Sequence, residues 1–170
     1  VIVNGSIRFK KDVHYVNIIG KDSAGITYGF KCTNFAADRV SWFTMRRIEV
    51  GPNPSGTGIY LKQDPYLNEP WNHYPAYTNR KVTIDSCHVN NVDGEGMYIG
   101  HTYPNGDPAY SYNIPQRLDS VTISNNIVDS TGWDGIQLSN ARDGCRIFNN
   151  TVTNFGLLDL DGQRAGIISG

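Results

Sequence analysis

The stretch VTISNNIVDSTGWDGIQLSNA, residues 121–141, recurs in this chain in altered form. A second copy, VTIDSCHVNNVDGEGMYIGHT, starts at Val82, and a third, CRIFNNTVTNFG, starts at Cys145 and is completed by AGIISG at the end of the chain. With the copies in register, the third position is isoleucine and the eighth is valine in all three. Two weaker copies start at Val16 and Phe43. The chain therefore carries five copies of one unit.

Each copy contains three short segments in which apolar and polar residues alternate, which is the pattern of a strand with one buried face. A repeating unit of this length indicates a solenoid, in which each unit buries its apolar face on its neighbours. A helical fold fits poorly, because no copy has a long apolar stripe at helical spacing and Asn, Gly and Thr are poor helix formers. The alternative is an antiparallel sandwich with chance similarity, and the close matches between copies argue against it.

Composition and charge exclude several classes of protein. The chain has 170 residues, 39% of them apolar, and a net charge of −1. No basic stripe suggests a nucleic-acid partner, and no apolar run is long enough for membrane insertion. The three cysteines are too widely spaced for a zinc or redox motif. Because the chain starts without Met and ends inside a copy, we expect it to be a piece of a longer polypeptide.

The asparagine pairs Asn125-Asn126 and Asn149-Asn150, together with segments of the GIQL type, resemble the right-handed parallel β-helix proteins of the pectate-lyase-like superfamily. The resemblance covers roughly residues 14–170. It implies that stacked asparagines fill the turn between the second and third strands of each coil, one strand spacing of ~4.8 Å apart. We therefore expect an all-β fold: a right-handed, single-stranded parallel β-helix of about five rungs. Residues 1–170 would form one domain that is incomplete at both ends.

The alternation also predicts which side chains face the core. All three cysteines fall at inward positions, where we interpret them as small core residues rather than reactive thiols. The predicted inward set is Val16, Ile18, Phe30, Cys32, Phe43, Met45, Val50, Ile59, Leu61, Val82, Ile84, Cys87, Val89, Met97, Ile99, Val121, Ile123, Val128, Ile136, Leu138, Cys145, Ile147, Val152 and Ile167.

An outward column of side chains is expected along the first strand of each rung. Its members are Lys31, Tyr60, Tyr98, Gln137 and Ile168. In β-helix enzymes that act on polysaccharides, this face is the floor of the binding groove, so the resemblance implies a substrate-binding role for Lys31, Tyr60, Tyr98 and Gln137.

Two long insertions, residues 62–81 and 101–120, leave equivalent positions of neighbouring rungs and should lie side by side. We expect Trp71 or Tyr74 to approach Tyr103 or Tyr110. Tyrosine and tryptophan rings suit stacking on sugar rings, with a polar tip for hydroxyl groups. The alternative is that these aromatic side chains pack on each other and stabilise the insertions.

Three carboxylates, Asp93, Glu95 and Asp134, precede first strands, and Glu95 should stack on Asp134. Close carboxylates can raise one pKa and act as general acid and base in glycoside hydrolysis. They could equally supply oxygen ligands for calcium. The third interpretation is that they are solvent-facing turn residues. Calcium is the one cofactor that the sequence suggests.

Cationic and acid–base candidates are fewer. His101 follows a first strand beside the expected groove and could exchange protons or bind substrate, whereas His88 should point outward on another face. A lyase needs a base and cations that neutralise a uronate carboxylate, and Lys31 and Arg142 are the choices near the groove. The motif set of polygalacturonases is absent, so the sequence leaves the reaction type open.

These features together predict a bacterial, secreted or cell-surface protein that binds a polysaccharide and, as an enzyme, would cleave it as a lyase or glycoside hydrolase. Its partners would be the polysaccharide and the rest of a larger polypeptide or surface complex. The alternative is a non-catalytic β-helix that serves as an adhesin-like surface or passenger domain. A tailspike-like trimer would need an outward apolar strip, which the outward residues Asn17, Thr44, Thr83, Thr122 and Arg146 do not provide.

Overall fold

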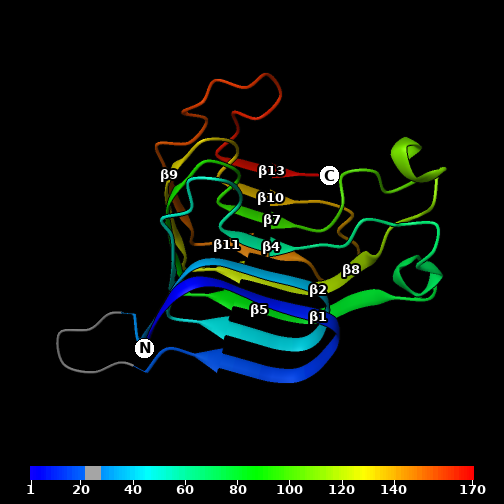
Figure 1. Ribbon diagram of the computed structural model, residues 1–170, viewed down its shortest axis with the longest axis horizontal. Helices are drawn as coiled ribbons and strands as arrows, with labels where there is room; N and C mark the ends of the chain where they lie inside the picture. The colour runs from blue at the N-terminus through cyan, green and yellow to red at the C-terminus, as the bar shows by residue number, and fades with distance from the viewer. Residues whose placement is uncertain (22–27) are drawn as a thin grey trace.

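The chain winds into a parallel β-helix, and the predicted fold class is confirmed (Figure 1). The structure is a computed structural model that describes residues 1–21 and 28–170. All paired strands run parallel, and the sheet curves 296° around its axis. Among the described residues, no helix is long and apolar enough to cross a membrane.

The strands stack into three faces. Face A consists of the middle of β2, β4, β7, β10 and β13; face B of the end of β2, β5, β8 and β11; face C of the start of β2, β3, β6, β9 and β12. The strands are β1 (Ile2–Ile19), β2 (Phe30–Arg46), β3 (Ile48–Val50), β4 (Ile59–Leu61), β5 (Thr78–Asp85), β6 (His88–Val92), β7 (Met97–Ile99), β8 (Arg117–Ser124), β9 (Ile127–Thr131), β10 (Ile136–Leu138), β11 (Arg146–Phe148), β12 (Thr151–Thr153) and β13 (Ile167–Ser169). Two short 3₁₀ turns, η1 (Pro70–Asn72) and η2 (Pro108–Tyr110), interrupt the long insertions.

Inward side chains form one continuous core along the axis. Phe43, Val82 and Val121 are in register and fully buried, as are Met45, Ile84 and Ile123 in the next inward column. The predicted inward set is confirmed through most of its length. Towards the last coils Ile147 and Val152 are only partly buried and Ile167 is 48% exposed, because no further described strand covers them.

The corner between faces B and C carries the asparagine stack that the resemblance implies. Asn126 is buried; it donates from Nδ2 to the Ile84 carbonyl at 3.0 Å and to Asn150 Oδ1 at 2.9 Å. The Cys87 backbone N–H donates to Asn126 Oδ1 at 2.8 Å. Each asparagine therefore satisfies backbone groups that the turn would leave unpaired.

Glycine directly before β4, β7, β10 and β13 allows close packing between coils. A Cβ atom on Gly96 would lie 2.4 Å from Val128 Cγ1 and 2.5 Å from the Gly135 carbonyl oxygen. On Gly135 it would lie 2.3 Å from Val152 Cγ1. The valine of one coil therefore fills the space that the missing side chain of the glycine leaves in the preceding coil.

The first two coils differ from the prediction. Lys31 pairs with Glu49 of β3, so it belongs to face C, and the face A residue in register with Tyr60 is Ala36. β1 follows β2 around all three faces, so residues 2–13 add segments on faces C and A that the repeat did not indicate. Where the later coils have a glycine directly before the face A strand, β1 and β2 have Ser6 and Asn34, and this difference caused the error in register.

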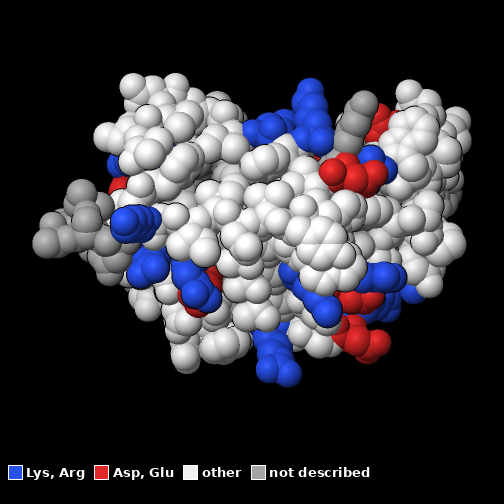
Figure 2. Space-filling view, turned by 90° about the horizontal axis from the view of Figure 1, so that it is seen from below, with Lys and Arg blue, Asp and Glu red and all other residues white. Residues whose placement is uncertain are grey.

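Charges of both signs are mixed on the surface. Figure 2 shows Lys and Arg lying beside Asp and Glu on the face seen from below, with no extended field of one sign. This distribution agrees with the net charge of −1.

Candidate functional site

A groove of about 830 Å³ crosses the outward side of face A. Its floor is Ala36, which stands in register between Arg8 of β1 and Tyr60 of β4. A methyl group between two long side chains leaves a hollow. The lining residues are Ser6, Arg8, Lys10, Asn34, Ala36, Asp38, Arg39, Asn53, Ser55, Gly56, Thr57, Tyr60, Gln63, Asp64, Tyr66, Glu69, Trp71 and Asn72.

Two turns wall the groove. The turn after β3 is fixed by Asn34 and Asn53, whose Nδ2 atoms donate to the Thr57 carbonyl at 2.9 and 3.0 Å. The opposite wall is the insertion between β4 and β5, where Glu69 accepts hydrogen bonds from Gln63, at 3.3 Å, and from Asn72. The groove thus presents amides, hydroxyls and carboxylates held in place by neighbouring groups.

Most charged groups of the groove are paired. Arg8 Nη2 lies 2.8 Å from Asp38 Oδ1. The buried Arg39 has its Nε 3.0 Å from Asp12 Oδ1, and its Nη1 donates to the Trp71 carbonyl at 3.4 Å. Arg39 thereby ties the first coil to the tip of the insertion.

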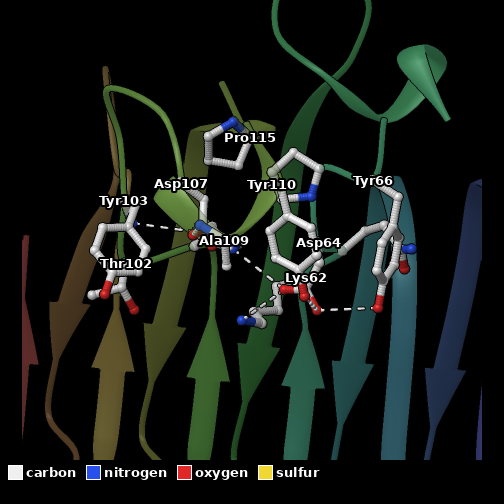
Figure 3. Close-up of polar contacts among 12 residues, drawn as sticks. Lys62, Asp64, Tyr66, Thr102, Tyr103, Asp107, Ala109, Tyr110 and Pro115 are labelled. Atoms are coloured by element: carbon white, nitrogen blue, oxygen red, sulfur yellow. Dashed lines mark hydrogen bonds and ion pairs between the residues drawn. The ribbon is translucent and has the colours of Figure 1, made fainter. Parts of the chain in front are cut away.

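A second, smaller hollow of about 430 Å³ adjoins the groove at Asp64. Asp64 Oδ1 lies 3.1 Å from Lys62 Nζ and 3.3 Å from His101 Nε2. Its Oδ2 accepts from the hydroxyl of Tyr110 at 3.2 Å and from that of Tyr66 at 3.4 Å (Figure 3). One carboxylate therefore gathers four donors from both insertions.

His101 is buried between two carboxylates. Its Nε2 lies 3.3 Å from Asp64 Oδ1 and 3.2 Å from Asp107 Oδ2. Its Nδ1 accepts a hydrogen bond from the Tyr103 backbone N–H at 3.2 Å. Since Nδ1 is an acceptor, the proton of the neutral imidazole resides on Nε2 and faces both carboxylates. His101 Nε2 thus lies between a carboxylate of each insertion.

The surroundings of Asp64 and Lys62 stabilise the charged forms of both side chains. The hydrogen bond from His101 and the charge of Lys62 hold the pKa of Asp64 well below its usual range. Burial acts to lower the pKa of Lys62, but the phenolic groups of Tyr60 and Tyr98 and the Asp64 carboxylate raise it above its ordinary value. Burial raises the pKa of Tyr60 to about 12. At neutral pH Asp64 is anionic and Lys62 cationic, so Lys62 is not available as a base.

The two insertions lie side by side, as predicted, but through other residues than expected. Tyr66 and Tyr110 meet edge to face with ring centroids 5.0 Å apart, and Asn113 Nδ2 donates to the Pro65 carbonyl at 3.0 Å. The Tyr74 backbone N–H bonds to the Ile114 carbonyl, whereas its ring lies 3.4 Å from the Arg117 guanidinium carbon. Trp71 is 51% exposed at the groove.

The three predicted carboxylates separate into two kinds. Glu95 and Asp134 are buried and in register on adjacent coils. Glu95 Oε2 accepts from the Thr57 hydroxyl and Asp134 Oδ1 from the Ala165 backbone N–H, both at 2.7 Å. Asp93 is exposed. These contacts correspond to turn chemistry. No group of three or more His, Cys, Asp or Glu suited to a metal ion occurs within residues 1–21 and 28–170.

The other candidates lie at varied distances from the groove. Tyr60 and Tyr98 meet edge to face at 5.8 Å on face A. Gln137 donates from Nε2 to Thr102 Oγ1 at 3.2 Å and to Ser139 Oγ at 3.1 Å. Arg142 is exposed and lines neither hollow.

The prediction that Lys31 lies in the groove was wrong. Its Nζ lies 2.6 Å from Glu49 Oε1 on face C, away from the groove. His88 is in register with Glu49 on the same face, outside both hollows as expected.

Several groove residues were missed by sequence reasoning. Ala36, Asp38 and Arg39 stand in β2, where the register was misjudged. Asp64 and Asp107 each directly precede a proline in the insertions, a pattern that by itself indicates a turn. Only the placement of two insertions on adjacent coils could have suggested that these carboxylates meet.

Comparison with known proteins finds no matching family model, no similar curated protein and no similar solved structure.

Proposed function

We propose that this protein is a polysaccharide-binding β-helix of the pectate-lyase-like type, which acts outside the cell and holds a glycan chain in the groove over face A. The observation that carries the proposal is the groove itself. It is lined by amide, hydroxyl and carboxylate groups and has the exposed rings of Tyr66 and Trp71 at its wall. Aromatic faces beside hydrogen-bonding groups suit the two faces of a sugar ring.

Binding, rather than a named reaction, is the part of the proposal that the site supports best. The charges at Asp64 and Lys62 are fixed near neutral pH, which suits recognition better than proton transfer. Cleavage by a lyase or hydrolase route stays a prediction, and His101 and Asp107, which line the second hollow, are acid–base groups that it could involve.

The test is a binding screen against polygalacturonate, alginate, xylan and a β-glucan, with and without calcium, by calorimetry. Product assays for unsaturated ends and for reducing ends run in parallel. The decisive variant is Ala36→Tyr, which fills the groove with a side chain that face A already carries at Tyr60 and Tyr98. We expect a loss of affinity of at least about tenfold, equivalent to about 1.4 kcal/mol.

Thr44→Tyr is the matched control, because it adds the same side chain to the same strand on the outward side of face B. Unchanged affinity in Ala36→Tyr would contradict binding in the groove. If the intact chain binds none of the four glycans, a non-catalytic surface or passenger β-helix becomes the better interpretation.

A further inference from the structure

Four aromatic side chains gather on the outer surface at the corner between faces A and B, outside both hollows. Tyr15 and Trp42 stack with ring centroids 5.1 Å apart and planes inclined by 23°. His14 lies 6.3 Å from Trp42 and 6.4 Å from Tyr77. Tyr15 is 74% exposed and Trp42 39%. We call Tyr15, Trp42, His14 and Tyr77 the aromatic corner.

The backbone makes Tyr15 and Trp42 unusual residues for their positions. Both have left-handed conformations, with φ of 57° and 50°. The residues in register on the next coils are Lys81, Ser120 and Gly144, also left-handed. A bulky aromatic residue is disfavoured in this region, because its Cβ crowds the backbone.

The fold therefore requires a left-handed residue at this corner but does not require an aromatic one. A serine or a glycine serves the same corner in later coils. Neither Tyr15 nor Trp42 is a core residue, so packing of the core does not account for them. What the fold leaves unexplained is a pair of large, exposed aromatic rings at this position, and this points to a surface role.

Arg39 connects the groove to the aromatic corner. Arg39 lines the groove beside Trp71, and its guanidinium carbon lies 5.5 Å from the centroid of the Tyr77 ring. His14 then connects Tyr77 to the stacked pair. A ligand that leaves the groove past Trp71 would meet this surface next.

We propose that the aromatic corner is an outer subsite, which holds sugar rings of a glycan chain beyond those held in the groove. This inference rests on the proposed function. Aromatic faces accept the apolar face of a sugar ring, while the phenol, indole and imidazole groups can bond to its hydroxyls. Lys81 Nζ lies over the Trp42 ring, 5.8 Å from its centroid. Tyr15 is therefore the ring of the stacked pair that is open to a ligand.

The test compares chain lengths. The glycan chosen by the binding screen, from polygalacturonate, alginate, xylan and β-glucan, is used as the polymer and as its tri- and tetrasaccharides. Trp42→Ser and Tyr15→Ser each place in the corner a residue that Ser120 shows to be compatible with it. We expect polymer affinity to fall about 3- to 10-fold, with oligosaccharide affinity and the thermal midpoint not lowered.

Ser120→Asn is the matched control, because it changes the same corner two coils away from Trp42. Unchanged polymer affinity in both serine variants, with binding lost in Ala36→Tyr, would overturn the subsite and leave the groove intact. Equal losses for polymer and oligosaccharide would also overturn it, since the corner would then be part of the groove. Failure of the intact chain to bind any of the four glycans would overturn the proposed function and the subsite together.

Discussion

Asp64 joins the groove to the second hollow, and its environment limits what it can do. Lys62, His101, Tyr66 and Tyr110 all direct donors at its two oxygens. A carboxylate with so many donors is stabilised in its charged form, so it is a poor general acid. Its most direct effect is mechanical, because it fastens the insertion after β4 to the insertion after β7.

Thiol reactivity provides a prediction at the scale of single residues. Burial raises the pKa of Cys32 to about 11 and of Cys87 to about 12, and the thiolate is the reactive form. Cys145 is only partly buried. We expect a thiol reagent such as DTNB at pH 8 to label all three cysteines in denaturant. In the folded protein, no cysteine other than Cys145 should be labelled rapidly.

The variant Cys145→Ser should remove the rapid phase and leave two slow thiols. Rapid labelling of Cys32 or Cys87 in the folded protein would contradict the inward placement of these side chains.

The turn between faces B and C shows how a sequence element sets a structural one. Asn126 satisfies the Cys87 N–H and the Ile84 carbonyl while bonding to Asn150 on the next coil. The same corner has left-handed residues at Arg47, Ser86, Asn125 and Asn149. The repeated asparagine pair meets both needs of this turn. Its first residue tolerates the left-handed conformation, and the side chain of its second residue bonds to backbone groups that the turn leaves without a partner.

The variant Asn126→Ala should destabilise the protein by about 1–3 kcal/mol, because it leaves a buried N–H and a buried carbonyl without partners. The measurement is the free energy of unfolding in urea. Asn105→Ala is the control, since Asn105 is exposed in an insertion, and it should change stability little. A loss in Asn126→Ala no larger than in the control would mean that the ladder is not a stabilising element.

The sequence predicted the fold best where local chemistry is repeated. Glycine, valine and asparagine recur in the last coils because each makes a contact with the next coil, so their spacing revealed the strands. In β1 and β2 the chain turns the corners within continuous strands, and Ser6 and Asn34 occupy the position at which later coils have the glycine that reveals the register. Lys31 was consequently assigned to the wrong face.

The candidate site was less predictable than the fold. The two aromatic insertions were recognised, and their contact is confirmed through Tyr66 and Tyr110. The groove floor was missed, because an alanine in a strand carries no chemical signal. Ala36 forms a hollow only because its neighbours in register, Arg8 and Tyr60, have long side chains, and both belong to other coils.

At the scale of the whole molecule, acid should unfold the β-helix. Hydrogen bonds lower the pKa of Asp129 through Thr153 and Asn154, and those from Asn125 and Ser124 outweigh burial to lower that of Asp85. With Asp64, these carboxylates link successive coils or insertions. Groups with a lowered folded pKa contribute stability above the unfolded value of about 3.9, and this is lost as pH falls through the folded pKa.

We therefore expect these three carboxylates to leave the midpoint of urea unfolding nearly unchanged from pH 7 to pH 5. Below about pH 4 the midpoint should fall steeply. The variant Asp85→Asn should flatten this acid limb and also lower stability at pH 7. An acid limb with the same steepness in the variant would show that Asp85 does not contribute to it.

The insertions have one further consequence. The segments 62–77, 100–116 and 139–145 connect face A to face B on successive coils, yet the strands on both sides stay in register. The entropy of closing a loop grows slowly with its length. Evolution can therefore lengthen, shorten or replace the walls of the groove without refolding the scaffold, and a library with randomised insertions could acquire new specificities on an unchanged coil.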